Sequence, residues 1–67
     1  MKINKKFITL SQLLKMEDYV SSGGMVKHVI NDFDITVNGE DEHRRGKKLY
    51  PGDLIIINGN KIMIEKE

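Results

Sequence analysis

The hydrophobic period of this chain changes once, near residue 34, from the spacing of an α-helix to that of a β-strand. Before that point, apolar side chains recur at the i, i+3, i+4 and i+7 spacing that places them on one helical face; they are Val26, Val29, Ile30 and Phe33. After it, Ile35 and Val37 alternate with polar residues. A helical half followed by a strand half is typical of the α+β class. We therefore expect an α+β fold in which two short N-terminal helices pack on a small, mainly antiparallel sheet.

The first helix has a start signal at Thr9. Thr9 and Gln12 stand three residues apart, the spacing of a capping box, in which each side chain accepts a hydrogen bond from the backbone of the other residue. Leucines at positions 10, 13 and 14 then share one face, and Lys15 and Asp18 are expected to face water.

A second helix is expected after the break at residues 21–24. Ser21 and Ser22 precede two glycines, and either serine is a suitable N-terminal cap. The polar positions of this helix lie away from its apolar stripe; they are Gly24, Lys27, His28 and Asn31.

Turn residues divide the second half of the chain into strands. Asn38-Gly39 is the pair that a tight hairpin turn prefers, and Tyr50-Pro51-Gly52-Asp53 and Asn58-Gly59-Asn60 are further turn signals. We expect strands over 35–37, 42 to 44 or 45, 54–57 and 61–65, with an N-terminal edge strand at Phe7-Ile8.

Length and composition limit the number of domains and the classes of protein to which this chain can belong. Sixty-seven residues suffice for one domain, 1–67, with a core unit over about 7–57 and a C-terminal hairpin over 54–65. There is no cysteine, and His28 and His43 stand in no metal-ligand spacing. No secretory or membrane-spanning apolar run occurs. We expect a cytoplasmic protein without metal or cofactor.

The strongest functional signal is the basic ridge, residues 44–48, with sequence Arg-Arg-Gly-Lys-Lys. It contains four cations and no anion, although the whole chain carries a net charge of only +1. Gly46 lets the strand bulge or bend and spread these side chains. A solvated edge strand is the alternative, but edge protection rarely needs four adjacent cations. The pattern favours contact with phosphates.

Two neighbouring segments bear on this interpretation. Residues 22–24 leave the start of the second helix without bulky side chains, so its N–H groups can approach an anion; alternatively the glycines only permit a tight turn. The acidic run 40–42 is expected to be a solvated hairpin loop, or else a lobe that faces a protein. We expect Lys27 and His28 to lie beside the basic ridge and complete a cationic groove.

The sequence gives little support for catalysis, for nucleotide binding or for base stacking. No nucleophile, base and acid stand in a catalytic arrangement, and the glycines with Lys27 do not form a phosphate-binding loop of the Walker type. Phe7 and Phe33 are expected in the core, which leaves Tyr19 and Tyr50 as the rings that can be exposed for base stacking. Enzymatic activity is therefore not expected.

These segments resemble the RNA-binding domain named after ribosomal protein S-four, whose two helices and following strands form the alpha-L motif. The similarity runs from about Phe7 to Ile57, and small stand-alone bacterial members are the most similar. It is carried, in this order, by Ser22-Gly23-Gly24 with Lys27, Val37-Asn38-Gly39-Glu40, the basic ridge with Leu49, and Tyr50-Pro51-Gly52-Asp53.

The resemblance implies binding to structured RNA, typically ribosomal RNA, and a role in assembly of the large ribosomal subunit. The residues implied by position are Lys27, His28, Arg44, Arg45, Lys47 and Lys48. Additional contacts are expected from Lys15, Ser22, Gly23, Gly24 and Asn31. Larger relatives carry catalytic modules such as pseudouridine synthases, but no such module is present here.

Three alternatives remain at this point. The acidic hairpin and the basic ridge can serve as complementary patches of a protein-interaction module. The same cationic surface also suits transfer RNA or peptidyl-tRNA on stalled ribosomes. DNA is less favoured, because no helix presents a run of base-reading side chains. No membrane partner is expected.

Overall fold

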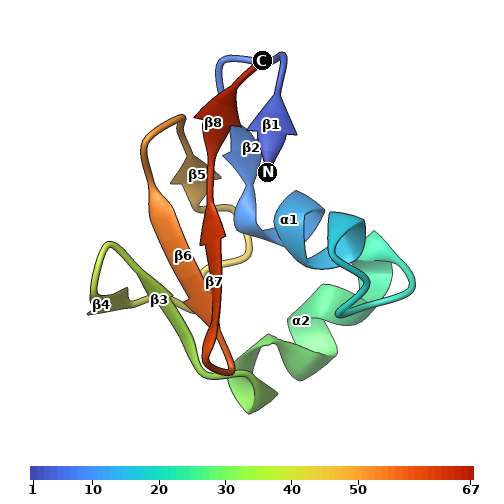
Figure 1. Ribbon diagram of the computed structural model, residues 1–67. Helices are drawn as coiled ribbons and strands as arrows, with labels where there is room; N and C mark the ends of the chain where they lie inside the picture. The colour runs from blue at the N-terminus through green and yellow to red at the C-terminus, as the bar shows by residue number, and fades with distance from the viewer.

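The computed structural model describes residues 1–67 and combines short strands with two helical regions (Figure 1). The strands are β1 Lys2–Ile3, β2 Ile8–Thr9, β3 Ile35–Val37, β4 Glu40–Asp41, β5 Lys48–Leu49, β6 Leu54–Ile57, β7 Asn60–Met63 and β8 Glu65–Lys66. The helical segments are α1 Leu10–Met16, η1 Gly23–Met25, α2 Val26–Val29 and η2 Ile30–Asp32. The predicted α+β class with antiparallel sheets is confirmed. The helices do not open the chain, however, because β1 and β2 precede α1.

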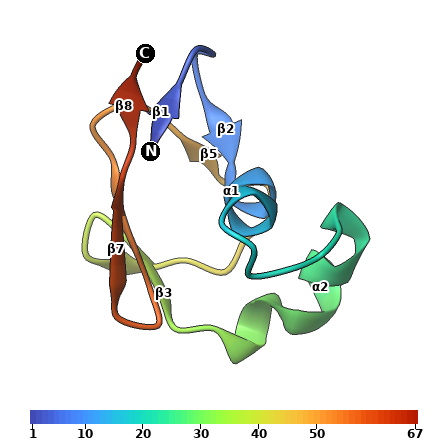
Figure 2. The ribbon, with the colours of Figure 1, turned by 45° about the vertical axis from the view of Figure 1, so that its right-hand side comes forward.

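The main sheet has four antiparallel strands in the order β4-β3-β6-β7. β2 pairs with β5 in a small antiparallel ladder, and β1 pairs with β8 in parallel. The β1–β8 pair places the two chain ends side by side (Figures 1 and 2). The N-terminal ammonium of Met1 donates to the Met63 carbonyl at 2.8 Å and strengthens this closure.

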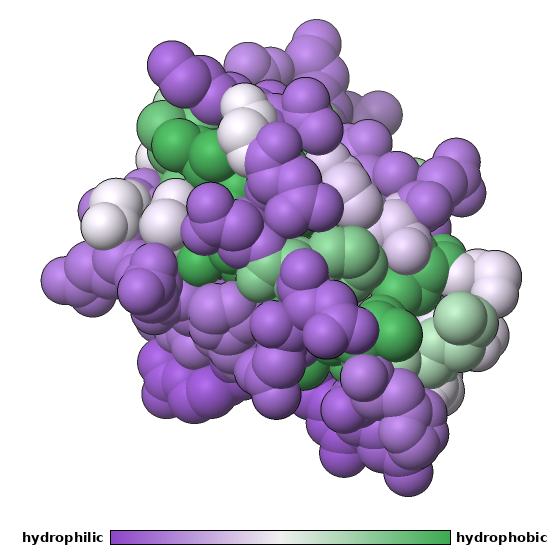
Figure 3. Space-filling view, turned by 90° about the horizontal axis from the view of Figure 1, so that it is seen from below, coloured by the Kyte–Doolittle hydropathy of each residue, from purple (hydrophilic) through white to green (hydrophobic).

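One face of the main sheet is buried and the other meets solvent. Ile35, Ile55 and Ile57 have no exposed surface, whereas Thr36, Ile56 and Lys61 are registered across β3, β6 and β7 and point the opposite way. Fourteen buried residues form a single cluster, which joins the buried sheet face to α1, α2 and the short ladders. Seen from below, polar side chains cover most of the surface and apolar ones show between them in patches (Figure 3).

Both predicted Asn-Gly hairpins have the expected turn geometry. Asn38 and Gly39 have φ values of 52° and 87°, and Asn58 and Gly59 have 50° and 86°. Two consecutive positive φ angles are typical of the type I′ turn, whose twist matches that of the paired strands. Local turn chemistry therefore sets the register of β3–β4 and of β6–β7.

The capping box of α1 is confirmed. The Gln12 amide donates to Thr9 Oγ1 at 3.2 Å, and the Thr9 amide donates to Gln12 Oε1 at 2.9 Å. Leucines 10, 13 and 14 are fully buried, as the helical spacing predicts.

No helix in the structure has the length and apolar character needed to cross a membrane.

The second helical region is less regular than predicted. Its four-residue α-helical turn, α2, lies between the 3₁₀ segments η1 and η2. The expected serine cap is wrong: Ser22 occupies the capping position without a side-chain hydrogen bond, and the Ser21 hydroxyl donates to Met25 Sδ at 2.8 Å. The apolar stripe is confirmed, with Val26 and Ile30 buried and Val29 and Phe33 half-buried.

The predicted return strand through Glu42 to Arg44 or Arg45 is also wrong, because β4 ends at Asp41. The Glu42 amide donates once more to the Ile35 carbonyl at 3.0 Å, and the chain then leaves the sheet. His43 Nε2 lies 2.9 Å from the Phe33 carbonyl oxygen. The bend expected at Gly46 is a turn over Arg45 and Gly46, outside any strand.

We predict that Thr9→Ala lowers the free energy of unfolding by about 1 kcal/mol, because it leaves a first-turn amide of α1 without an acceptor. Ser22→Ala is the matched control and should cause no loss, since the Ser22 hydroxyl caps nothing. Urea denaturation of both variants measures the difference. Equal losses would contradict the assigned roles of the two residues.

Candidate nucleic-acid interface

The backbone of the basic ridge is bonded to the first turn of α1. The Ser11 amide donates to the Arg45 carbonyl, and the Leu10 amide donates to the Lys47 carbonyl, both at 2.9 Å. A third bond, from the Lys47 amide to the Arg44 carbonyl at 3.0 Å, closes the turn between them. Figure 2 shows the segment between β4 and β5 passing by the start of α1.

These bonds follow from the chemistry of a helix start. The first amides of a helix have no acceptor within the helix and need one from outside. In α1 the capping box satisfies two amides and the ridge carbonyls satisfy those of Leu10 and Ser11. The basic ridge is therefore held in one position by backbone contacts, which do not use its side chains.

Arg44 does not point freely to solvent. Its Nε and Nη2 donate to the two carboxylate oxygens of Glu42 at 2.9 and 2.8 Å, and its amide donates to the same carboxylate at 3.1 Å. The Glu42 side chain is only 11% exposed, whereas that of Arg44 is 75% exposed. The expectation that all of residues 40–42 form a solvated loop is wrong for Glu42; Glu40 and Asp41 are exposed.

The ion pair changes the titration of Glu42. Hydrogen bonds from the Arg44 side chain lower the pKa of Glu42 from 4.5 to about 2, with smaller contributions from the Arg44 backbone amide and from the charges of Arg44 and Lys47. The same contact raises the pKa of Arg44. At neutral pH the pair is fully charged, and one cation of the basic ridge is neutralised from within the chain.

The other three cations differ in their surroundings. Arg45 and Lys47 make no side-chain hydrogen bond or ion pair; Arg45 is exposed and Lys47 is half-buried. The Lys48 ammonium lies 4.9 Å from the centre of the Phe7 ring, a cation–π distance. Phe7 is half-buried and lies outside the buried core cluster, contrary to the prediction from sequence.

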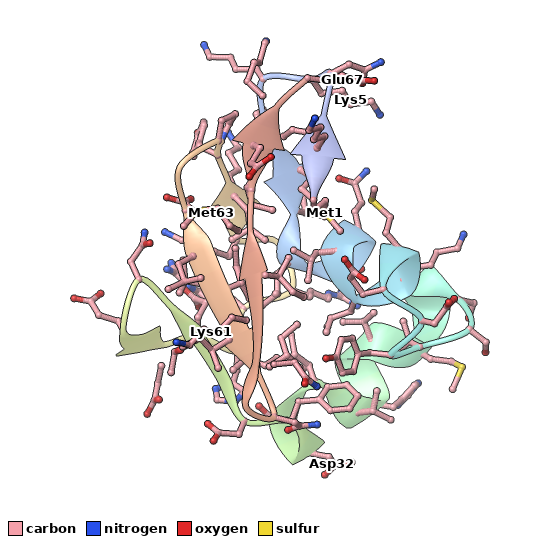
Figure 4. The ribbon with its side chains drawn as sticks, viewed as in Figure 1. Met1, Lys5, Asp32, Lys61, Met63 and Glu67 are labelled. Atoms are coloured by element: carbon pink, nitrogen blue, oxygen red, sulfur yellow. The ribbon has the colours of Figure 1, made fainter.

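The surface has two hollows, one of which includes residues of the basic ridge. A polar one of about 250 Å³ is lined by Val37, Asn38, Glu40, Glu42, Arg44 and Lys47. A larger one of about 460 Å³ is lined by residues of the N-terminal segment, α1 and the C-terminus: Lys2, Ile3, Asn4, Lys5, Ile8, Gln12, Lys15, Met16 and Glu67. The sequence interpretation included Lys15 but missed Lys2 and Lys5. Figure 4 shows Lys5 and Glu67 at the same end of the molecule.

The predicted helix residues lie on separate segments. Lys27 and His28 are exposed on α2, and Asn31 is exposed on η2. No hydrogen bond or ion pair joins them to the basic ridge, whose backbone contacts are with α1 and, through Lys48, with β2. Their participation in one groove with the basic ridge is therefore a proposal.

The two glycines at residues 23 and 24 are not required by the turn geometry. Neither has a positive φ, and an added Cβ would meet nothing within 4 Å at Gly23 and only Ser22 Oγ at 4.0 Å at Gly24. The tight-turn explanation thus finds no support at these positions. A helix start this short and irregular does not by itself form an anion site.

Comparison with known proteins decides the family. The model of the S4 domain matches residues 1–65. The chain belongs to the S4 domain family. The match confirms the family that the sequence resembles, as indicated by Ser22-Gly23-Gly24 with Lys27, the basic ridge and the two turns that flank the ridge.

One curated relative is similar over most of its length. The chain is 46% identical over 57 residues to a protein of Bacillus subtilis (strain 168) described as "Probable ribosome maturation protein RlbA"; the alignment covers 85% of this chain and 80% of the relative. No solved structure matches the chain.

The Glu42–Arg44 pair of this S4 domain predicts a pH effect on stability. Because the pKa of Glu42 is lowered on folding, the stabilisation is fully present above pH 4.5 and is lost as the pH falls toward 2. Glu42→Gln should remove this part of the pH dependence. Urea denaturation of both proteins across that range measures it, and identical pH profiles would contradict the ion pair.

A second prediction concerns the glycines. Gly23→Ala and Gly24→Ala should leave the melting temperature unchanged or slightly raised, because Ala fits the space and restricts the unfolded chain. Gly39→Ala is the destabilised control, since Gly39 has a φ of 87°. Thermal denaturation followed by circular dichroism tests this; melting temperatures for the first two variants as low as for Gly39→Ala would contradict it.

Proposed function

We propose that this protein is a non-enzymatic cytoplasmic factor that binds structured RNA, with ribosomal RNA as the target, and acts in maturation of the ribosome's large subunit. Residues 1–67 act as one RNA-binding domain in this proposal. The observation that carries it is the basic ridge held on α1, which presents Arg45, Lys47 and Lys48 from a fixed backbone. Membership of the S4 domain family and the printed name of the Bacillus relative support the same reading.

The electrostatics favour phosphate contacts over base reading along this surface. Three cations without an internal carboxylate partner stand within four residues, and phosphate contacts of this kind supply affinity that depends on salt but not on sequence. Lys27 and His28 extend the surface if the RNA also reaches α2. Arg44 contributes less, because a phosphate must compete with Glu42 for its guanidinium.

The protein-interaction alternative is weakened by the same pair. It requires acidic and basic patches that are both available to a partner, yet Glu42 is already bound to Arg44, which leaves Glu40 and Asp41 as the exposed acids of the hairpin. Transfer RNA remains an alternative target with the same chemistry. Competition between transfer RNA and ribosomal RNA fragments for the labelled protein separates the two.

The salt dependence of RNA binding tests the proposal. For the double variant Arg45→Ala/Lys47→Ala, we expect weaker binding and a slope of log K against log salt that is shallower by about 1.5, since each lost phosphate contact removes roughly 0.7 to 0.9. Fluorescence anisotropy with a labelled ribosomal RNA fragment at several salt concentrations measures both quantities.

Lys61→Ala is the control for that experiment. Lys61 is an exposed cation on β7, on the sheet face opposite the buried isoleucines, and Figure 4 shows it on that strand. Its removal should leave the slope unchanged. Because Lys61→Ala removes one charge and the double variant removes two, a slope change in Lys61→Ala about half that of the double variant would mean that net charge, and not the basic ridge, governs binding.

Glu42→Gln gives a further test with the opposite sign. Removal of the carboxylate frees the Arg44 guanidinium, so we expect RNA to bind more tightly and with a steeper salt slope, by up to roughly 0.9. The same anisotropy assay measures this change. Weaker binding would show that Glu42 serves to orient Arg44 toward the RNA.

A further inference from the structure

We propose that Tyr50, supported by Phe7, is a stacking platform for one unpaired RNA base next to the basic ridge. This inference rests on the proposed RNA binding and adds a ligand class to it, a single-stranded nucleobase. The sequence alone placed Phe7 in the core and gave no reason to expect an aromatic pair here. The structure places the Phe7 and Tyr50 ring centres 5.7 Å apart at an interplanar angle of 49°.

Tyr50 is exposed, and its backbone is held in place. Tyr50 is 41% exposed, and its hydroxyl makes no hydrogen bond within the protein, whereas that of Tyr19 does. Its backbone is fixed on both sides: the Tyr50 amide donates to Asp53 Oδ2 at 2.9 Å, and the Asp53 amide donates to the Tyr50 carbonyl at 3.0 Å. A ring on a backbone that is ordered before binding loses less conformational entropy when a base stacks on it.

The turn beneath the ring is itself anchored in the sheet. Asn38 Nδ2 donates to Asp53 Oδ1 at 3.0 Å, and the Leu54 amide donates to Asn38 Oδ1 at 2.9 Å. The preceding residue, Leu49, is fully buried in β5. Tyr50 therefore stands on a rigid part of the fold, directly after the strand in which the basic ridge ends.

A cation lies beside the aromatic pair. The Lys48 ammonium, 4.9 Å from the Phe7 ring centre, is placed two residues before Tyr50. A nucleotide offers a phosphate and a base as one covalent unit, so a lysine and an exposed ring in this arrangement can contact both. A stacked base gains from the π-face of tyrosine whatever its identity, so the platform selects single-stranded over paired RNA.

Tyr19 is the internal comparison. Its ring packs edge-on against Phe33, with ring centres 5.7 Å apart, and its hydroxyl accepts a hydrogen bond from Asn60 Nδ2 at 3.1 Å. Tyr19 is half-buried and its hydrogen-bonding capacity is used within the protein. Only Tyr50 combines an exposed ring, an unbonded hydroxyl and a neighbouring cation of the basic ridge.

The test uses the full chain and two RNA probes, a hairpin with a loop of unpaired adenosines and the continuous duplex of the same stem. Tyr50→Leu should weaken binding to the hairpin by about fivefold or more, the scale of one lost base–aromatic contact, and change binding to the duplex by less than about twofold. Tyr50→Phe keeps the ring and should bind both RNAs like the unaltered protein. Fluorescence anisotropy measures the affinities.

A second measurement does not depend on the stability of the variant. In the unaltered protein, proton NMR should show the Tyr50 ring signals moving upfield when the hairpin is added, with the Tyr19 ring signals unmoved. Tyr50 signals that stay in place, or equal losses on both RNAs for Tyr50→Leu, would overturn the stacking platform alone. Absence of binding to either RNA by the unaltered protein would overturn the proposed function and the platform together.

Discussion

The amide protons of Leu10 and Ser11 are the contacts on which the rest of this structure depends. They are the first donors of α1, and the carbonyls of Lys47 and Arg45 accept them at 2.9 Å. A helix start needs outside acceptors, and these bonds fix the backbone of Arg45 and Lys47 between the Glu42–Arg44 pair and β5. The basic ridge thus supplies acceptors for the first amides of α1, and α1 supplies donors that hold the backbone of the ridge. The helix is completed, and four cations are fixed at a defined place on the surface.

The cations of the basic ridge differ in the groups that lie next to them. Glu42 holds Arg44, Phe7 lies under the Lys48 ammonium, and Arg45 and Lys47 are left without partners. The net charge of +1 conceals this arrangement. The surface is therefore best understood as a few available cations with an aromatic pair at one end. In our proposal, RNA phosphates contact the cations of residues 45–48 and an unpaired base stacks on the ring of Tyr50.

The parts of the fold that were predictable from the sequence depend on local chemistry. The Thr9–Gln12 capping box, the two Asn-Gly turns and the α1 leucines all act within a few residues, and each is observed as expected. Apart from the missing serine cap at Ser22, the failures in the fold involve contacts between distant residues. The end of β4, the position of Phe7 against Tyr50 and the bonds from α1 to the basic ridge arise only on folding, so no local pattern reveals them. For the site, the sequence identified the cations but not which of them are neutralised.

The most direct test is amide hydrogen exchange of Leu10 and Ser11 in the free protein, measured by NMR. First-turn amides of a helix ordinarily exchange quickly, because they lack acceptors. The account predicts that these two exchange slowly, on the scale of the buried strands β3 and β6. Exchange as fast as that of the exposed residues 4–6 would show that the basic ridge is not held on α1, and would contradict the account.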